Sequence, residues 1–360
     1  MDNTAVHNEF MSYAINLAKK GRGQTSPNPL VGCVIVKNGR IIGEGWHEKF
    51  GSNHAEVNAF SNCSEPPEGA DLYVNLEPCS IFGKTPPCVD KIIENGIKNV
   101  YIGAKDLNPK INGNGVEKLQ LSGINVYEGI LEKECVDLNI GFLKWIQTSR
   151  PWVIVKIAQS QNGFMGMDSN SSIWITGKDT KINTHKLRSE VDGIMIGRQT
   201  AEIDNPLLTV REVAGKNPIR IIADTFRRLP LNLKFFRDST ASNIILCSEH
   251  KFPESETPNS LYLPVDEENG LLSPFNILDK LGQRGITKVL IEGGQKLISS
   301  FLNEDLVNEV YLYTSNNSLN NAKLRTPFNI DTNWDIVKKE SFVNDSLIIV
   351  RKKELCLQEL

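Results

Sequence analysis

The feature that most constrains this chain is an alternation of helical and strand-like patterns, which restarts near residue 150. In the first half, residues 4–20 place apolar side chains at helical spacing, and strand-like runs such as 30–36 follow. Pro151 comes directly before the strand-like run 152–157, and a proline in such a place is typical of a domain boundary. Helices that alternate with buried strands predict sheets covered by helices on both faces. We therefore expect two tandem α/β domains, residues 1–148 and 151–360.

Two local patterns add detail to this fold. Lys37-Asn38-Gly39 separates the strand-like runs 30–36 and 41–46, and it is typical of a hairpin turn. The stretch 251–270 is polar and rich in proline, glutamate and serine, so we expect a surface excursion there.

Charge and composition exclude several classes of protein. Forty Lys+Arg against 43 Asp+Glu give a net charge of −3, so the chain lacks the basic surplus of a general nucleic-acid binder. No apolar run approaches the ~18 residues of a membrane span, and the first twenty residues show no signal-peptide pattern. We therefore expect a cytoplasmic protein. In such a protein, the seven cysteines are not expected to form disulfides, and clustered cysteines are better interpreted as metal ligands or catalytic groups.

One histidine, one glutamate and two cysteines form a pattern typical of a zinc site. His54 and Glu56 stand at the start of a predicted helix, and Cys79 and Cys88 follow a predicted strand with eight residues between them. One imidazole and two thiolates suit Zn²⁺ and leave its fourth position for water, whose pKa falls to about 7. We therefore predict one catalytic zinc per chain, with Glu56 as the catalytic residue that moves the water's proton, and hydrolytic deamination as the reaction.

Each of these residues also has a plain structural interpretation. His54 alone is compatible with a surface histidine at a helix start, and Cys79 alone with a small buried side chain. A closed structural zinc site is the stronger alternative, but Cys33, Cys63 and Cys135 lack the paired short spacing that a fourth thiolate would need. The order of the motifs at strand–helix junctions favours the catalytic site.

The second half has no G-x-G-x-x-G fingerprint for a dinucleotide. Its strand-like run 289–292 ends in Gly293 and Gly294 before a predicted helix, a junction where backbone N–H groups can approach a phosphate. Arg188 and Arg211 are candidates for a substrate phosphate, because a guanidinium binds phosphate through two parallel hydrogen bonds. A glycine pair can also form a simple turn, and either arginine can be a solvated surface charge.

The motifs of the first half resemble the cytidine-deaminase-like superfamily. Within it, the eight-residue spacing between Cys79 and Cys88, with Pro27-Asn28-Pro29-Leu30-Val31-Gly32 and Gly45-Trp46-His47, is similar to the bifunctional riboflavin-biosynthesis deaminase/reductase (RibD) family. The tRNA-adenosine and cytidine deaminases usually keep two residues between these thiols. The resemblance runs from about residue 8 to about residue 352. It implies a cytidine-deaminase-like three-layer domain followed by a dihydrofolate-reductase-like domain that uses NADPH.

The resemblance also implies roles for individual residues. In the deaminase domain, the substrate would contact Asn28, His47, Lys84 and Thr85. In the reductase domain, NADPH would contact Ala158, Trp174, Thr200 and Asp204, and its phosphates would contact the backbone from Gly294 to Ser300. The phosphorylated substrate of that domain would contact Ser172, Arg188, Leu208, Arg211 and Glu292. Asn28 stands between two prolines in a rigid turn, where its amide could bind a pyrimidine edge or merely cap the turn.

The implied function is bifunctional. The first domain would deaminate 2,5-diamino-6-(ribosylamino)pyrimidin-4(3H)-one 5′-phosphate. The second would use NADPH to reduce the ribosyl side chain, which gives 5-amino-6-(ribitylamino)uracil 5′-phosphate. The partners would then be Zn²⁺, NADPH and a small phosphorylated pyrimidine, without nucleic acid or membrane, and the family suggests a homo-oligomer through the reductase domain.

Two segments depart from the family pattern. Gln161-Asn162 stands where the family usually has Leu-Asp, and residues 313–320 differ from a glycine-bearing family segment. One alternative is therefore a zinc deaminase of the same pathway whose second domain is inactive or serves only binding or assembly. Another is a deaminase of free nucleosides or nucleic acid, which fits poorly with the net charge of −3 and the thiol spacing.

Overall fold

The computed structural model describes residues 4–82, 86–108, 111, 113–168, 173–252 and 259–353. The chain divides into two compact units, Met1–Thr148 and Ser149–Leu360. Three residues predicted to bind substrate lie outside the described residues: Lys84, Thr85 and Ser172. No helix in the described ranges has the length and hydropathy to span a bilayer.

Unit 1 is built on a sheet with the strand order β2-β1-β3-β4-β5. Its strands are β1 (Gly32–Lys37), β2 (Arg40–Trp46), β3 (Asp71–Leu76), β4 (Asn99–Ala104) and β5 (Asn125–Tyr127). β1 is antiparallel to β2 and β3, whereas β3, β4 and β5 are mutually parallel. The predicted hairpin is confirmed: Asn38 and Gly39, both at positive φ, make its turn, as a type I′ turn requires.

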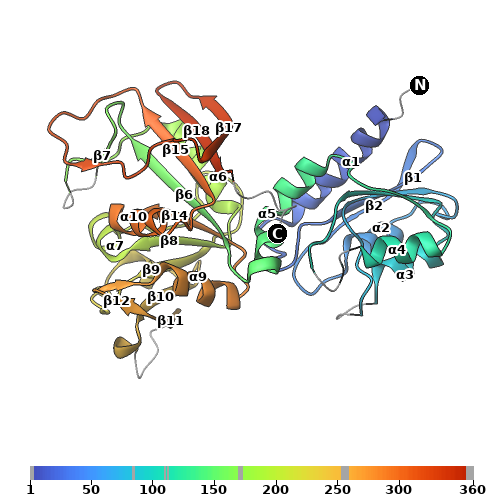
Figure 1. Ribbon diagram of the computed structural model, residues 1–360, viewed down its shortest axis with the longest axis horizontal. Coiled ribbons are helices and arrows are strands. Elements are labelled where there is room, and N and C mark those ends of the chain that lie inside the picture. Colours follow the sequence, from blue (N-terminus) through green and yellow to red (C-terminus); the bar gives the residue numbers. More distant parts are fainter. Residues whose placement is uncertain are drawn as a thin grey trace. The chain divides into compact units, whose positions relative to one another are not determined.

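Helices cover both faces of this sheet. They are α1 (Thr4–Ala18), the 3₁₀ turn Lys19–Gly21, α2 (Ala55–Ser61), α3 (Cys88–Glu94), α4 (Asn114–Leu121) and α5 (Glu132–Thr148). Figure 1 shows α1 and α5 on one face and α2, α3 and α4 on the other. Apolar side chains of the strands and of α2, α3 and α4 form a common core. The expected three-layer arrangement is therefore present.

Glycine in β2 lets α2 lie close against the sheet. A Cβ atom at Gly45 would come within 2.4 Å of the backbone nitrogen of Ala59 and 2.5 Å of the carbonyl oxygen of Ala55, so no other residue fits without a shift. This contact fixes the start of α2, the place from which His54 and Glu56 project.

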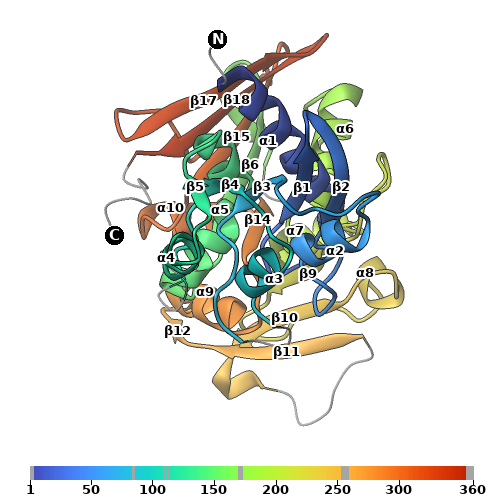
Figure 2. The same cartoon turned by 90° about the vertical axis from the view of Figure 1, so that its right-hand side faces the viewer.

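Unit 2 contains a sheet with the order β11-β10-β9-β8-β14-β6-β15-β18-β17. The strands are β6 (Trp152–Gln159), β8 (Gly193–Gly197), β9 (Ile219–Ala223), β10 (Asn243–Ser248), β11 (Ser260–Val265), β14 (Lys288–Gly293), β15 (Glu309–Ser315), β17 (Trp334–Ser341) and β18 (Asp345–Lys352). Neighbours from β11 to β15 are parallel, and β18 and β17 continue antiparallel. Figure 2 shows β11 and β17 at opposite edges of this sheet.

Two apolar cores lie on the two faces of the unit 2 sheet. Alternate strand residues pack with α9 (Pro274–Gln283) and α10 (Gln295–Asn303) on one face, and with α7 (Arg198–Asp204) and α8 (Lys234–Arg237) on the other. The remaining elements are α6 (Lys178–Ser189), the 3₁₀ turn Glu249–Lys251, the strand pair β7 (Phe164–Gly166) and β16 (Leu324–Arg325), and the pair β12 (Glu267–Glu268) and β13 (Leu271–Leu272).

The expectation that residues 251–270 form only a surface excursion is wrong. Within them, β11 pairs in parallel with β10 as the edge strand of the sheet, and Leu263 and Val265 are buried. The polar flanks obscured this short apolar run. Pro264 within it is compatible with an edge strand, because no second neighbour requires its missing N–H.

Candidate active sites

Three side chains of unit 1 converge from different elements. His54 directly precedes α2, Cys79 follows β3, and Cys88 opens α3. Their donor atoms all lie within 4.8 Å of one another, and His54 Nδ1 is 3.2 Å from Cys88 Sγ and 3.5 Å from Cys79 Sγ. Zinc bonds of about 2.0–2.3 Å in a tetrahedron put neighbouring donors about 3.6 Å apart. Both the donor types and their spacing therefore fit Zn²⁺.

The surroundings of the two thiols favour a thiolate. Hydrogen bonds from the Cys88 thiol and from His54 lower the pKa of Cys79, and the backbone nitrogen of Cys88 donates to Cys79 Sγ at 3.3 Å. The pKa of Cys88 is raised by its hydrogen bond to Cys79 and by burial. Since zinc binds the thiolate form, Cys79 is prepared for the metal by the protein alone.

Glu56 lies in the first turn of α2 and is only 3% exposed. Burial raises the pKa of its carboxyl group, and the negative charge of Cys79 acts in the same direction, whereas His54 opposes the shift. A buried carboxyl group beside the metal ligands can accept a proton and return it.

Asn28 and His47 meet beside the same cluster. His47 Nδ1 lies 2.9 Å from the carbonyl oxygen of Asn53, to which it can only donate, so Nε2 accepts from Asn28 Nδ2 at 3.1 Å. The rings of His47 and His54 are 5.8 Å apart. Burial lowers the pKa of His47, which favours this neutral form. The Oδ1 atom of Asn28 is then turned to no protein donor among the described residues.

Two buried asparagines that the motifs did not indicate hold the chain next to Asn28. Asn75 Oδ1 accepts from the backbone of Gly32 at 2.8 Å, and Asn139 Oδ1 accepts from the backbone of Leu30 at 2.8 Å. Both amide groups also donate to the Leu30 carbonyl oxygen. The sequence signal that could have indicated these two residues is a polar side chain within an otherwise apolar strand or helix.

Glu77, two residues before Cys79, is a second buried support. Its Oε2 accepts from the backbone of Asp106 at 3.3 Å and of Gly113 at 3.1 Å, and its Oε1 accepts from Gly115 at 3.1 Å and Val116 at 3.4 Å. One carboxylate thereby ties the turn that carries Cys79 to the start of α4.

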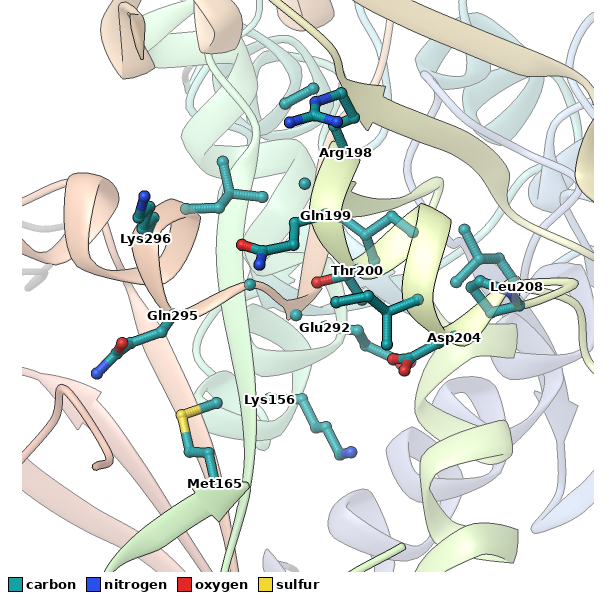
Figure 3. A pocket seen from close by; sticks show the side chains of 18 of the residues that line it. Lys156, Met165, Arg198, Gln199, Thr200, Asp204, Leu208, Glu292, Gln295 and Lys296 are labelled. Carbon is teal, nitrogen blue, oxygen red and sulfur yellow. The ribbon is translucent and has the colours of Figure 1, made fainter. Parts of the chain in front are cut away.

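Unit 2 contains a cavity of about 920 Å³. It lies at the carboxyl ends of β6, β8, β9 and β14, where parallel α/β sheets bind ligands. Its wall includes all the described residues that we predicted for the cofactor and substrate of this domain: Ala158, Trp174, Arg188, Thr200, Asp204, Leu208, Arg211, Glu292 and Gly294. Figure 3 shows Thr200 and Asp204 from α7 and Glu292 from β14 among the labelled side chains of this wall.

The glycine junction after β14 is closely packed against α7. A Cβ atom at Gly293 would lie 3.0 Å from Thr200 Cγ2, and Gly294 has a φ of 84° directly before α10. Both positions therefore favour glycine, and the backbone at the start of α10 forms part of the cavity wall.

The two candidate arginines differ in their partners. Arg188 donates to both oxygens of Glu292 at 2.6 Å, and these side chains are 13% and 7% exposed. Burial opposes ionisation of Glu292, but Arg188 outweighs it and lowers the carboxyl pKa. Arg211 donates to Thr209 Oγ1 at 2.6 Å and has no carboxylate partner among the described residues. Of these two arginines, Arg211 is therefore the one whose positive charge is available to an anion.

Lys156 and His185 are among the cavity residues that were not predicted from the sequence. Lys156 lies in β6, and burial lowers its pKa. A lysine within the apolar run 152–157 was a signal that we did not use. His185 precedes Arg188 by one helical turn, and nothing local in the sequence distinguishes it.

The two segments that depart from the family pattern contact each other. Asn162 Nδ2 donates to the Leu319 carbonyl oxygen and Asn162 Oδ1 accepts from the Leu319 backbone, both at 3.0 Å. The backbone of Gln161 donates to Asn317 at 2.9 Å. Neither segment supplies a described residue of the cavity wall.

Comparison with known proteins agrees with both halves. The family described as the cytidine and deoxycytidylate deaminase zinc-binding region matches residues 4–104, and the RibD C-terminal domain family matches residues 151–328. The riboflavin biosynthesis protein RibD of Actinobacillus pleuropneumoniae is 40% identical over 89% of this chain and 86% of its own length, and that of Aquifex aeolicus is 40% identical over 86% of each.

Solved structures agree over nearly the whole chain. A diaminohydroxyphosphoribosylaminopyrimidine deaminase/5-amino-6-(5-phosphoribosylamino)uracil reductase from Thermotoga maritima has a TM-score of 0.87 at 36% identity, covering 97% of this chain and 99% of that one. Acinetobacter baumannii RibD has a TM-score of 0.85 at 33% identity, covering 98% and 100%. The identity, the coverage and the two matched domains together show that the chain belongs to the RibD family of bifunctional riboflavin-biosynthesis deaminase/reductases.

Proposed function

We propose that the two sites carry out consecutive steps on one phosphorylated pyrimidine. The first is the deamination of 2,5-diamino-6-(ribosylamino)pyrimidin-4(3H)-one 5′-phosphate in unit 1. The second is the NADPH-dependent reduction of the ribosyl side chain in unit 2, which yields 5-amino-6-(ribitylamino)uracil 5′-phosphate. The observation that carries the proposal is the coexistence, in one chain, of a donor set that fits zinc and a cavity lined by the described residues predicted for NADPH and substrate.

In unit 1, His54, Cys79 and Cys88 would hold the zinc ion. When bound, zinc supplies a Lewis acid that makes water nucleophilic near neutral pH. Glu56 would take the proton of the attacking water and deliver it to the departing amino group, so that ammonia leaves as water adds. Asn28, held by its donation to His47 Nε2 at 3.1 Å, would bind the edge of the pyrimidine with its remaining amide atoms.

In unit 2, Ala158, Trp174, Thr200, Asp204 and the backbone from Gly294 would bind NADPH, which supplies the hydride. The substrate would lie against Arg188, Leu208, Arg211 and Glu292. The protein's task is to hold the nicotinamide against the sugar carbon that accepts the hydride, and the reduction also takes up one proton. Three further substrate contacts are proposed at residues outside the described ones: Lys84 and Thr85 for the substrate of unit 1, and Ser172 for that of unit 2.

The alternative of an inactive second unit is not favoured. The departures at Gln161-Asn162 and at 313–320 do not reach the described cavity wall, and the polar residues predicted for that wall are present in it. A homo-oligomer through unit 2 and a cytoplasmic location are further parts of the proposal. They are supported by the family resemblance, and sedimentation of the purified chain tests the first of them.

The decisive experiment supplies the diaminopyrimidine substrate with and without NADPH and identifies the products. We expect the deaminated uracil and ammonia without NADPH, and the ribitylamino product with it. Deamination that stops at the uracil in the presence of NADPH would contradict the proposal for unit 2. NADPH oxidation without ammonia release would contradict the proposal for unit 1.

A further inference from the structure

We propose that His185 is a positioning residue of unit 2, which holds the backbone of Arg211 so that the Arg211 guanidinium faces the phosphate of the substrate. The inference rests on the proposed function in one respect, the assignment of Arg211 to that phosphate. His185 acts through a hydrogen bond to another residue and not through contact with the reacting atoms.

The geometry of His185 defines this role. His185 lies in α6, is 2% exposed and forms part of the cavity wall. Its Nδ1 atom is 3.0 Å from the backbone nitrogen of Arg211. A backbone N–H can only donate, so Nδ1 is the acceptor and the ring carries its hydrogen on Nε2.

The charges around the ring keep it in this acceptor form. The charged groups near it are Lys181 and Arg188 of α6, Arg211, Glu212 and Glu292, and Lys181 pairs with Glu212 at 2.5 Å. Burial, followed by the charges of Arg188 and Arg211, lowers the pKa of His185 to about 4. A protonated ring would have no acceptor at Nδ1, so the neutral ring is the form that can hold Arg211.

The segment that His185 holds, residues 206–218, depends on side chains for its backbone hydrogen bonds. It contains no helix or strand, and Leu208 has a φ of 54°, in the left-handed region that few non-glycine residues adopt. The backbone nitrogen of Val210 donates to Asn217 Oδ1 at 2.8 Å, and the next one, of Arg211, donates to His185. Removing the His185 acceptor would leave the Arg211 backbone without this hydrogen bond, so that the guanidinium would be held only through its hydrogen bonds to Thr209.

Three single variants of the full-length zinc-loaded enzyme test the proposal. His185→Ala removes the acceptor, and we expect the KM for 5-amino-6-(ribosylamino)uracil 5′-phosphate to rise about 3- to 10-fold, the effect of one lost hydrogen bond. The kcat of reduction and the KM for NADPH should stay unchanged. His185→Gln retains an amide oxygen as an acceptor and should restore most of the KM. His250→Gln, at an exposed histidine in the 3₁₀ turn Glu249–Lys251, is the matched control and should change nothing.

A double variant separates positioning from an independent effect. If His185 acts through Arg211, then His185→Ala should add little to the KM once Arg211→Ala is present. An undiminished effect in the Arg211→Ala background would overturn the proposal, as would a failure of His185→Gln to restore the KM. Circular dichroism identifies an unfolded His185→Ala protein, in which case His185→Phe, which keeps a ring but has no acceptor, replaces it in both backgrounds.

Inorganic phosphate as a competitive inhibitor separates this inference from the proposed function. We expect Arg211→Ala and His185→Ala both to weaken the inhibition. If Arg211→Ala leaves inhibition and KM unchanged, then the assignment of the phosphate to Arg211 is wrong and the His185 inference falls with it. If Arg211→Ala weakens the inhibition by phosphate and raises the KM, whereas His185→Ala changes neither, then only the His185 inference is wrong.

Discussion

The two sites of this protein are built in different ways. The zinc site takes its ligands from residues 54–88, at the start of α2, after β3 and at the start of α3. The cavity of unit 2 is lined by residues spread from 156 to 324, and their residue types do not by themselves indicate a chemistry. In the first site the chemistry depends on which side chains are present, because imidazole and thiolate select the metal. In the second it depends on where side chains and backbone are held, because the cofactor supplies the reactive group.

The largest effect should come from Glu56, the proposed proton carrier of unit 1, on the rate of ammonia release. Glu56→Gln keeps the shape of the side chain but removes its ability to accept a proton. We expect ammonia release to fall by about 10²–10⁴-fold or more. The zinc content should stay near one per chain, and NADPH-dependent reduction of the deaminated substrate should be unaffected. Ammonia assays, metal analysis and NADPH absorbance measure these three quantities.

The control for this prediction is Glu48→Gln, at an exposed glutamate in the same unit, which should leave ammonia release unchanged. If Glu56→Gln still deaminates at the wild-type rate, then the mechanism given for unit 1 is wrong. If it lowers the rate of NADPH-dependent reduction equally, then the two sites are not independent of each other.

The next effect concerns the ion pair in the wall of the second site. Glu292→Ala leaves the largely buried Arg188 without its carboxylate partner, which should destabilise unit 2 by about 3–5 kcal/mol and remove reductase activity. The thermal transition that NADPH shifts upward reports on unit 2.

The exposed pair Lys338–Glu340, at 56% and 33% exposure, provides the matched control for Glu292→Ala. Glu340→Ala should shift the same transition by less than about 1 kcal/mol. Equal shifts for the two variants would show that burial adds nothing to the pair. Loss of zinc or of deamination in Glu292→Ala would contradict the separation of the two sites.

The features of this protein differ in how well the sequence predicts them. The hairpin at Asn38-Gly39 and the zinc pattern were predictable because both depend on residue types at short spacing. β11 was not, since its apolar run is short, lies between polar flanks and is placed at the sheet edge only by its pairing with β10. His185 had no local signal at all, because its role arises from a contact with Arg211, 26 residues away.

A moderate effect should come from Trp174, which forms part of the cavity wall while 72% exposed. If NADPH covers this ring, as proposed, then Trp174→Ala should raise the KM for NADPH about 10-fold through the loss of aromatic contact area. Tryptophan fluorescence of the wild type should change when NADPH binds, and the change should shrink in the variant. Phe252→Ala, at an exposed aromatic residue outside the described cavity wall, should leave both quantities unchanged. A Trp174→Ala enzyme with normal NADPH affinity would remove Trp174 from the site.

The smallest expected effect concerns the pH dependence of the His185 contribution: the ratio of the KM values of His185→Gln and wild type should not change with pH. Because the pKa of His185 is lowered to about 4, below the ordinary value of about 6.5, the ring stays neutral when the pH falls from 8 to about 5.5. The stability linked to His185 is complete above about pH 6.5 and is lost as the pH falls toward 4, since the unfolded chain takes up the proton first.

The substrate phosphate itself titrates near pH 6, so the KM of every variant changes with pH. The ratio of the KM values of His185→Gln and wild type cancels that change and should stay constant from pH 8 to 5.5. A ratio that becomes smaller as the pH is lowered would show that the wild-type ring takes up a proton in this range and loses its hydrogen bond to the Arg211 backbone. The second site would then depend on a titrating side chain as well as on position.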